Sequence, residues 1–174
     1  VLDIGCNDGT QLNFFKARGF NTFGIDPAEN IYATSSENHN VICDFFGPHI
    51  ADKFDIFLDA ITAQNVFAHN PNPIEFLETC KKLMSPHTKL YIQTSQADMV
   101  LNNEFDTIYH EHLSFFNTAS MDALVTRAGL YLVDVVKTPI HGNSYVFVVT
   151  KRSGNRSLVD HQLKLEREQG LQNL

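Results

Sequence analysis

The stretch that decides the fold reads Val1-Leu-Asp-Ile-Gly5-Cys-Asn-Asp8-Gly9-Thr-Gln-Leu12. It has the composition of a core strand over residues 1–4, then of a tight turn around two glycines, and then of a helix start. Glycine at positions 5 and 9 lets the backbone pass close to a ligand, where a Cβ atom would collide with it. A strand, a turn and a helix in this order predict the first unit of a βαβ fold.

The rest of the chain alternates short apolar runs with longer amphipathic stretches, the pattern of βαβ units around a parallel sheet. We expect strands near residues 1–4, 22–25, 41–43, 54–59, 89–93, 131–136 and 145–150. We expect helices near residues 10–18, 31–37, 73–84 and 120–128, and a helical segment without a Gly or Pro terminator over 157–174. The last two strands can pair antiparallel through the turn from Pro139 to Asn143. The prediction is a Rossmann-like α/β domain whose mostly parallel sheet ends in an antiparallel edge hairpin.

The composition favours a single domain that binds small molecules. A chain of 174 residues, 43% of them hydrophobic, can bury one sizeable core. A net charge of −7 argues against binding to nucleic acid, which needs clustered Lys and Arg. Three scattered cysteines predict neither a disulfide framework nor a zinc site, and no apolar stretch approaches the roughly 18 residues of a membrane span. We therefore expect a soluble, cytoplasmic protein.

The spacing of the first turn indicates which ligand it binds. It matches neither GxxxxGK[ST] nor the third glycine of GxGxxG, the patterns that seat phosphates. Acidic residues flank the turn instead, at Asp3 and Asp8. They would repel a phosphate, but they would attract the ammonium group of a methionine moiety.

Two further strand ends carry carboxylates. Asp26-Pro27 closes the second strand, in the position from which such folds hold ribose hydroxyls. Asp44-Phe45 closes the third and offers a carboxylate for an adenine amino group and a ring to stack on it. Ribose binding without pyrophosphate binding predicts S-adenosylmethionine as the cofactor, although such pairs also occur in ordinary turns. The expected cofactor contacts are Asp3, Gly5, Asn7, Asp8, Gly9, Asp26, Pro27, Asp44 and Phe45.

Five segments resemble one family, the sugar C-methyltransferases that act on nucleotide-linked 4-keto-6-deoxy sugars. The block around Tyr109-His-Glu-His112 is the most specific of them. The resemblance implies a class I methyltransferase core over residues 1–154, a zinc domain before it, and a connection over 155–174 into a C-terminal domain that binds the sugar nucleotide. It also adds Asn65 to the cofactor contacts. The matching segments are residues 4–10, 24–30, 65–69, 102–116 and 141–144.

The chemistry of methylating a carbon next to a ketone explains the same block. An α-proton must be removed by a base, and the enolate oxygen must be stabilised by a donor. By resemblance, His112 is the expected base, Tyr109 and His69 lie near the keto oxygen, and Glu111 supports them. His110 is expected to face away.

Other interpretations remain open at this point. His-Glu-His could ligate a metal, although HExxH is absent and we expect no metal; the block could also be a solvated loop. The enzyme could methylate oxygen or nitrogen, or the domain could bind the cofactor without catalysis. The stretch Gln93-Thr94-Ser95-Gln96 and Val146 depart from the family pattern, which usually carries a glutamate in the first and an arginine at the second, so the sugar is not identified. His39, His49, His87 and His161 are expected at the surface.

Overall fold

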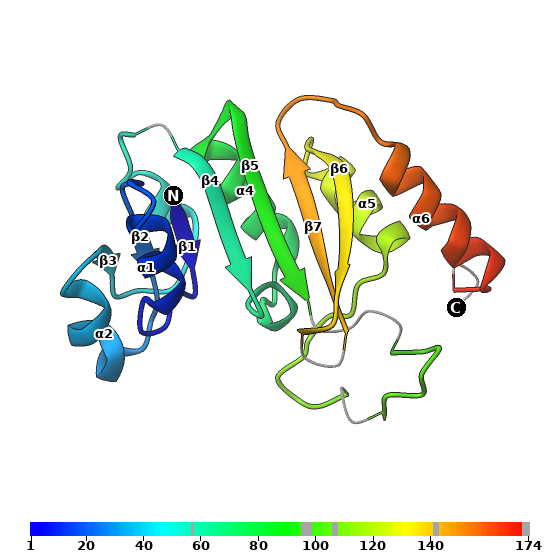
Figure 1. Cartoon of the computed structure of the whole chain (residues 1–174), viewed down its shortest axis with the longest axis horizontal. Coiled ribbons are helices and arrows are strands. Elements are labelled where there is room, and N and C mark those ends of the chain that lie inside the picture. Colours follow the sequence, from blue (N-terminus) through cyan, green and yellow to red (C-terminus); the bar gives the residue numbers. More distant parts are fainter. Residues whose placement is uncertain (57, 95–98, 106–107, 141–142, 172–174) are drawn as a thin grey trace.

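One seven-stranded sheet organises the chain in the computed structural model, which describes residues 1–56, 58–94, 99–105, 108–140 and 143–171 (Figure 1). The strand order is β3-β2-β1-β4-β5-β7-β6, and the pairs from β3 to β5 are parallel. The strands are β1 (Leu2–Ile4), β2 (Phe23–Ile25), β3 (Asn40–Ile42), β4 (Leu58–Gln64), β5 (Met84–Thr94), β6 (Tyr131–Thr138) and β7 (Ser144–Thr150).

The helices begin where the sequence provides caps. Pro73 occupies the first turn of α4, and Asn72 accepts the N–H of Glu75 at 3.3 Å. Asn117 and Ser120 form a reciprocal capping box at the start of α5. The helices are α1 (Thr10–Lys16), α2 (Glu29–Ser36), α3 (Pro48–Ala51), α4 (Pro73–Leu83), α5 (Thr118–Arg127) and α6 (Ser157–Glu168), with a 3-10 turn, η1, at Phe67–His69.

The two antiparallel strands complete the sheet at one edge. β7 lies between β5 and β6 and runs antiparallel to both, with Ile92 opposite Phe147 and Val136 opposite Val146. This arrangement confirms the predicted Rossmann-like α/β fold with an antiparallel hairpin at its edge. Because β1, β4 and β5 are parallel, their carboxyl ends and the loops after them meet at one edge of the sheet, which is at the bottom of Figure 1.

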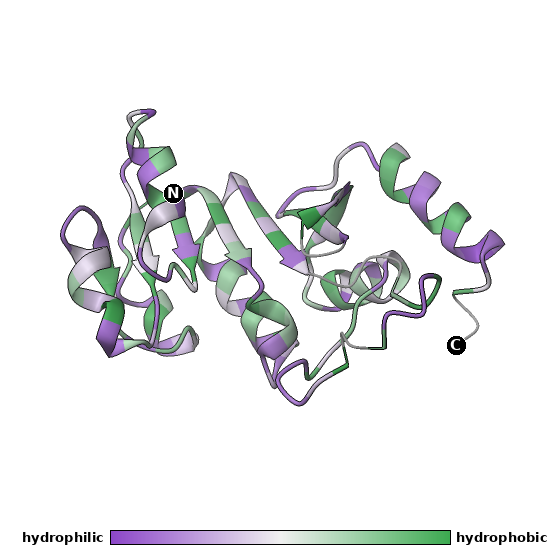
Figure 2. Ribbon diagram, turned by 60° about the horizontal axis from the view of Figure 1, so that its bottom comes forward, coloured by the Kyte–Doolittle hydropathy of each residue, from purple (hydrophilic) through white to green (hydrophobic). Residues whose placement is uncertain are grey.

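The core lies between the strands and the helices that cover them. Figure 1 shows α4 and α5 behind the sheet, and the strands in Figure 2 alternate apolar and polar residues. The ring of Phe67 packs against Phe76 and Phe116, with centroids 5.2 and 5.0 Å apart. Each side chain of this size contributes about 1.5–3 kcal/mol by burial. This cluster fixes the backbone just before His69, at the carboxyl edge of the sheet.

The predicted fourth strand was wrong. Residues 54–59 were expected to form it, but β4 runs from Leu58 to Gln64. Ile61 and Ala63 are fully buried, and Thr62 between them donates to Asp3 at 2.6 Å, so the neighbouring strand β1 satisfies this polar residue. The alternation of Phe54 and Ile56 suggested that the strand begins there. The strand that pairs with β1 lies further along the chain. β5 is also longer than expected, and α3 was not predicted.

The end of α6 corrects a second expectation. Gly170 has a φ of +76° and ends the helix, with Leu171 N–H donating to Glu166 O at 2.9 Å, so a glycine terminator is present after all. The Glu166 carboxylate is fully buried and accepts the N–H groups of Thr118 and Ala119 at 2.6 and 3.1 Å, which caps α5. α6 therefore packs as part of the same core. Its role as a connection to a further domain stays a prediction.

Candidate active site

The glycine turn, residues 5–9, leads from β1 into α1. Gly5 has a φ of +74° and Gly9 a φ of +82°, conformations that L side chains rarely adopt. A Cβ atom on Gly5 would collide with the Cγ2 of Val66. The missing side chain at position 5 therefore makes room for the loop after β4, and not only for a ligand, as the sequence suggested.

Asp26 ties this turn to the end of β2. Its two carboxylate oxygens accept the backbone N–H groups of Asn7 and Ala28, each at 2.9 Å. Asn7 itself has a φ of +49°, so the hydrogen bond holds an unusual backbone conformation in place. The carboxylate is half-buried and keeps lone pairs for a ligand.

Asp3 is a residue of β1, just before the turn, and its carboxyl group contacts Thr62 of β4. It is 3% exposed, and burial raises the pKa of its carboxyl group to about 6 although the hydroxyl of Thr62 donates to it. The neighbouring Asp26 raises the pKa further. The negative charges of these two aspartates lie close enough to disfavour one another, and a cation bound at the turn would relieve that repulsion.

The remaining acidic residues lie nearer the surface. Asp8 accepts the N–H of Thr10 at 2.9 Å, and hydrogen bonds from Thr10 lower the pKa of this carboxyl group. Asp44 accepts the N–H of Phe45 at 2.8 Å, a contact that lowers the pKa of Asp44. The ring of Phe45 is 74% exposed. A flat aromatic ligand could therefore stack on it.

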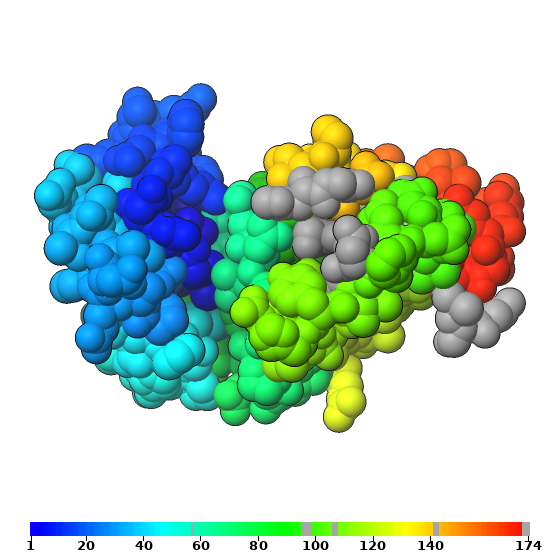
Figure 3. Space-filling view, turned by 90° about the horizontal axis from the view of Figure 1, so that it is seen from below, coloured from blue at the N-terminus to red at the C-terminus, as the bar shows by residue number. Residues whose placement is uncertain are grey.

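A cavity of about 390 Å³ opens at the carboxyl edge, and we call it the strand-end cavity. Figure 3 looks at this edge, with residues 1–45 in blue to cyan on one side and the segment after residue 99 in green on the other. Six of the predicted cofactor contacts line it together with His69, whereas the described Asn7, Asp8 and Gly9 lie on the adjoining turn and Asp3 lies just before that turn, in β1. The predicted residues in its wall are Gly5, Asp26, Pro27, Asp44, Phe45, Asn65 and His69.

Asn65 has the geometry of a ligand contact. It follows β4 directly with a φ of +52°, and its N–H donates to Gln93 O at 3.2 Å. Its side-chain Oδ1 is buried and has no hydrogen-bond partner in the described part of the chain. Buried polar atoms are rarely left unpaired, and strained residues gather at functional sites.

Apolar residues of the cavity escaped the sequence analysis. Phe46, Val66 and Phe76 line the wall, and Phe46 and Phe76 pack edge to face with centroids 4.8 Å apart. Such residues carry no sequence signal that separates a cavity wall from the core. Only the positions of Phe46 and Val66 soon after strand ends could have indicated these two, and Phe76 lies inside α4.

A second segment, residues 108–117, packs against His69, which lines the cavity, and we call this segment the histidine loop. It has no helix or strand, and backbone hydrogen bonds hold it: Leu113 and Ser114 donate to Ala68 O at 2.9 and 3.2 Å. His69 Nδ1 adds a contact of 2.9 Å to Glu111 O. The loop is therefore fastened to the segment that follows β4.

These contacts bring three predicted catalytic residues together. The Tyr109 hydroxyl lies 3.1 Å from His112 Nε2, and the two rings are 4.2 Å apart between centroids. The ring of His69 lies 4.9 Å from that of His112. Glu111 contributes its backbone carbonyl, whereas its carboxylate lies 3.8 Å from His110 Nε2. The side chain of His110 is 90% exposed, and its ring lies at the edge of the cluster, 6.3 Å from that of Tyr109 between centroids.

One histidine expected at the surface is buried. His39 is 8% exposed, and its Nδ1 and Nε2 lie 2.7 and 3.1 Å from Thr22 Oγ1 and Asn13 Oδ1. Burial lowers its pKa, so the neutral ring supports the turn at Gly9 from below. His49, His87 and His161 are exposed as predicted.

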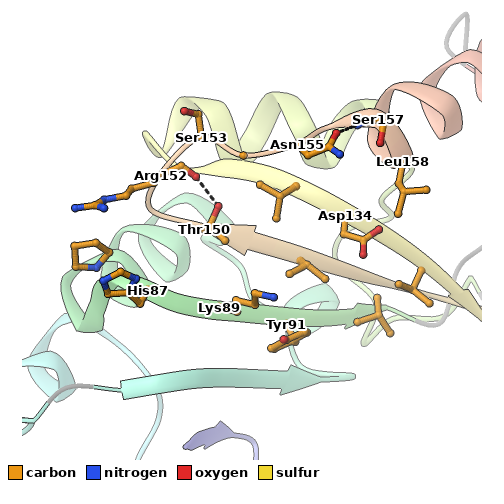
Figure 4. A pocket seen from close by; sticks show the side chains of 16 residues that line it. His87, Lys89, Tyr91, Asp134, Thr150, Arg152, Ser153, Asn155, Ser157 and Leu158 are labelled. Carbon is orange, nitrogen blue, oxygen red and sulfur yellow. Dashed lines mark hydrogen bonds between the residues drawn. The ribbon is translucent and has the colours of Figure 1, made fainter.

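A larger concavity of about 740 Å³ lies on the outer face of β5, β7 and β6, away from this edge (Figure 4). Tyr91 and several valines form its floor, with Lys89, Asp134 and Arg152 among its polar residues. None of the predicted site residues lines it. Size alone therefore does not locate the active site.

The described residues contain no group of three or more His, Cys, Asp or Glu side chains placed to hold a metal ion. A separate search of the same residues finds no helix long and apolar enough to cross a membrane.

Residues 1–135 match the model of the methyltransferase domain family, so the chain belongs to this family. S-adenosylmethionine is the cofactor of the family, as the sequence predicted. The chain is 29% identical to the C-methyltransferase NovU of Streptomyces niveus, over 98% of this chain and 43% of NovU.

Two other proteins are informative. A ubiquinone biosynthesis O-methyltransferase of Glaesserella parasuis serovar 5 (strain SH0165) is 33% identical over 54% of this chain and 44% of its own length. The solved plantazolicin methyltransferase BpumL in complex with SAH has a TM-score of 0.65 at 18% identity, over 87% of this chain and 75% of BpumL. The chain thus spans less than half the length of these two curated relatives.

Proposed function

We propose that this chain is the catalytic core of an S-adenosylmethionine-dependent C-methyltransferase that methylates the carbon next to a ketone in a nucleotide-linked deoxysugar. The observation that carries the proposal is the pair formed by Tyr109 and His112. A hydroxyl donor and an imidazole nitrogen 3.1 Å apart lie beside His69, which lines the strand-end cavity. The match to the C-methyltransferase NovU runs over 98% of the chain and so includes the histidine loop.

The residues of the cavity fit the cofactor. Asp26 would hold the ribose hydroxyls, and Phe45 would stack on the adenine while Asp44 accepts from its amino group. Asp3 and Asp8 would supply negative potential for the cationic methionine end. Asn65 Oδ1, buried and unpaired in the described part of the chain, leaves a polar group whose partner the cofactor would provide. When bound, S-adenosylmethionine supplies an electrophilic methyl group on its sulfonium.

The Tyr109–His112 pair suits a ketone. A carbonyl oxygen and the α-carbon are separated by two bonds, and the hydroxyl and the imidazole nitrogen are neighbours in space. The substrate would exchange this hydrogen bond for two of its own contacts. Tyr109 O–H would donate to the keto oxygen, and His112 Nε2 would take the α-proton as the electron pair moves into the enolate. The enolate carbon would be the nucleophile for the methyl group that bound S-adenosylmethionine supplies, and the electron pair of the broken methyl–sulfur bond would leave with S-adenosylhomocysteine.

An oxygen substrate is the second candidate, because ubiquinone biosynthesis O-methyltransferases also match this chain. A hydroxyl acceptor needs a base but no enolate, so it would leave the Tyr109 donor without a keto oxygen to stabilise. The match to NovU covers 98% of the chain, compared with 54% and 78% for two of the O-methyltransferases. This difference favours the carbon acceptor.

The domain organisation follows as a proposal. Residues 1–154 would form the cofactor-binding core, and residues 155–174 would lead toward a further domain that binds the sugar nucleotide. The length of NovU, of which this chain covers 43%, supports the presence of such domains in the relatives.

Product analysis tests the proposed function. The full-length protein is incubated with S-adenosylmethionine carrying a CD₃ group, and with either a nucleotide-linked 4-keto-6-deoxyhexose or a polyprenylated catechol. We expect a C–CD₃ bond next to the ketone in the sugar, detected by carbon NMR. Formation of an aryl methyl ether and no sugar product would overturn the proposal.

A further inference from the structure

A contact with the histidine loop fixes which ring nitrogen of His69 carries the proton. Its Nδ1 lies 2.9 Å from the backbone oxygen of Glu111. A carbonyl oxygen can only accept a hydrogen bond, so Nδ1 must carry the proton. In the neutral ring the other nitrogen, Nε2, then carries a lone pair and can only accept.

The other side of the ring faces ligand space. His69 lines the strand-end cavity, and within the described part of the chain its Nε2 has no hydrogen-bond partner. Its ring centroid lies 4.9 Å from that of His112, the expected base. The acceptor nitrogen of His69 and the proton-abstracting His112 are therefore close enough to contact the same sugar ring.

This pattern changes the role expected of His69. A keto oxygen offers only lone pairs, so a neutral His69 whose Nε2 is unprotonated cannot donate to it. Tyr109 is the donor of the cluster that remains for that oxygen. His69 instead needs an O–H or N–H group from its ligand.

We propose that His69 Nε2 accepts a hydrogen bond from a hydroxyl or amino group of the substrate adjacent to the carbon that is methylated. His69 then selects ketones that carry such a neighbouring donor and discriminates against simple ketones. The same ring has two separable tasks: Nδ1 holds the histidine loop, and Nε2 recognises the substrate. The inference rests on the proposed function, because it takes the substrate to be a ketone.

Two substitutions separate the tasks. His69→Asn keeps a donor near the position of Nδ1 and removes the acceptor at Nε2, whereas His69→Gln keeps an acceptor near Nε2 and removes the donor to Glu111. The probes are a nucleotide-linked 4-keto-6-deoxyhexose and its analogue in which the hydroxyl next to the methylated carbon is replaced by hydrogen. The full-length protein is assayed for kcat/KM with both, and calorimetry with S-adenosylmethionine checks that each variant is folded.

We expect His69→Asn to lower kcat/KM for the hydroxylated sugar by about 10- to 100-fold, because the hydroxyl donor of the sugar is left unpaired. For the deoxy analogue, which lacks this donor, kcat/KM should change less than about threefold. His69→Gln should retain part of the preference for the hydroxylated sugar. The wild type should show the same preference, which tests the inference even if a variant fails to fold. Equal losses for both sugars, with no wild-type preference, would overturn the inference and leave His69 as a loop anchor. A wild type that binds S-adenosylmethionine but methylates neither sugar would overturn the proposed function, and this inference with it.

Discussion

The glycine turn and the histidine loop lie at the same edge of the sheet, but their backbones are fixed in different ways. The turn is held by β2 and the residue after it: Gly5 N–H donates to Ile25 O at 2.7 Å, and Asn7 N–H donates at 2.9 Å to Asp26, 19 residues along the chain. The loop is held by the segment after β4, where Ala68 O and His69 Nδ1 contact residues more than 40 positions away. The locally held glycine turn suits a cofactor, whose structure does not vary. The histidine loop, held by a distant part of the chain, suits a substrate, whose structure varies.

The difference predicts that substitutions in the two regions separate binding from chemistry. Replacing His112 by Asn should have the largest effect, a loss of methyl transfer of about 10²- to 10⁴-fold, because the base that takes the α-proton is removed. The affinity for S-adenosylmethionine, measured by calorimetry, should stay within a factor of two. His110→Asn is the matched control, since that side chain is 90% exposed, and it should keep its activity. Equal losses in the two variants would contradict the role of His112.

Replacing Asp26 should weaken the binding of S-adenosylmethionine, which the His112 substitution leaves unchanged. Asp26→Ala removes a charged acceptor of the ribose and the anchor of Asn7, so the Kd for S-adenosylmethionine should rise about 10- to 150-fold. Glu29→Ala, on an exposed residue of α2, is the control and should bind normally. Micromolar binding that survives Asp26→Ala would overturn the assignment of the ribose ligand.

Replacing Asp3 should raise the stability of the protein and weaken its binding of S-adenosylmethionine. The protonated carboxyl group contributes stability that is fully present below its ordinary pKa of 3.8 and is lost as the pH rises through about 6, because the folded protein holds a proton that the unfolded chain has released. The loss amounts to about 3 kcal/mol. Asp3→Asn cannot ionise and can still accept from Thr62, so at pH 7.5 its Tm should exceed that of the wild type by about 6–12 °C.

Calorimetry across the pH range checks this prediction. The Tm difference should shrink as the pH falls toward 4, and the variant should bind S-adenosylmethionine more weakly at pH 7.5. A Tm difference that is the same at every pH would show that the charge of Asp3 is not its source.

Phe45 should have the smallest effect. Its ring is 74% exposed, so Phe45→Ala should leave folding intact and raise the Kd for S-adenosylmethionine by about 3- to 10-fold, the loss of one stacking contact. Phe14→Ala, on a ring of α1 that is 63% exposed, should not change the Kd. An unchanged Kd in Phe45→Ala would place the adenine elsewhere.

The same contrast explains what the sequence could predict. Gly5, Asp26 and Asp44 follow short strands, so local pattern placed them at the carboxyl edge together. β4 was misplaced because its buried polar residue Thr62 is satisfied by β1, through Leu2 O and the Asp3 carboxylate, partners 60 and 59 positions away. The burial of His39 depends on Thr22 and Asn13 in the same way.

The histidine loop shows a second limit of sequence reasoning. The motif identified Tyr109 and His112, but no periodicity could show that Glu111 acts through its backbone carbonyl. That contact, and with it the protonation of His69, depends on how the loop packs against the segment after β4.

Deuterium exchange tests the central claim, enolisation by Tyr109 and His112, most directly. The full-length protein is incubated in heavy water with S-adenosylhomocysteine and a nucleotide-linked 4-keto-6-deoxyhexose, so that abstraction can occur without methyl transfer. We predict that deuterium enters the carbon that normally receives the methyl group, and that His112→Asn abolishes this exchange. Exchange in His112→Asn at the wild-type rate, together with undiminished methylation, would contradict the account.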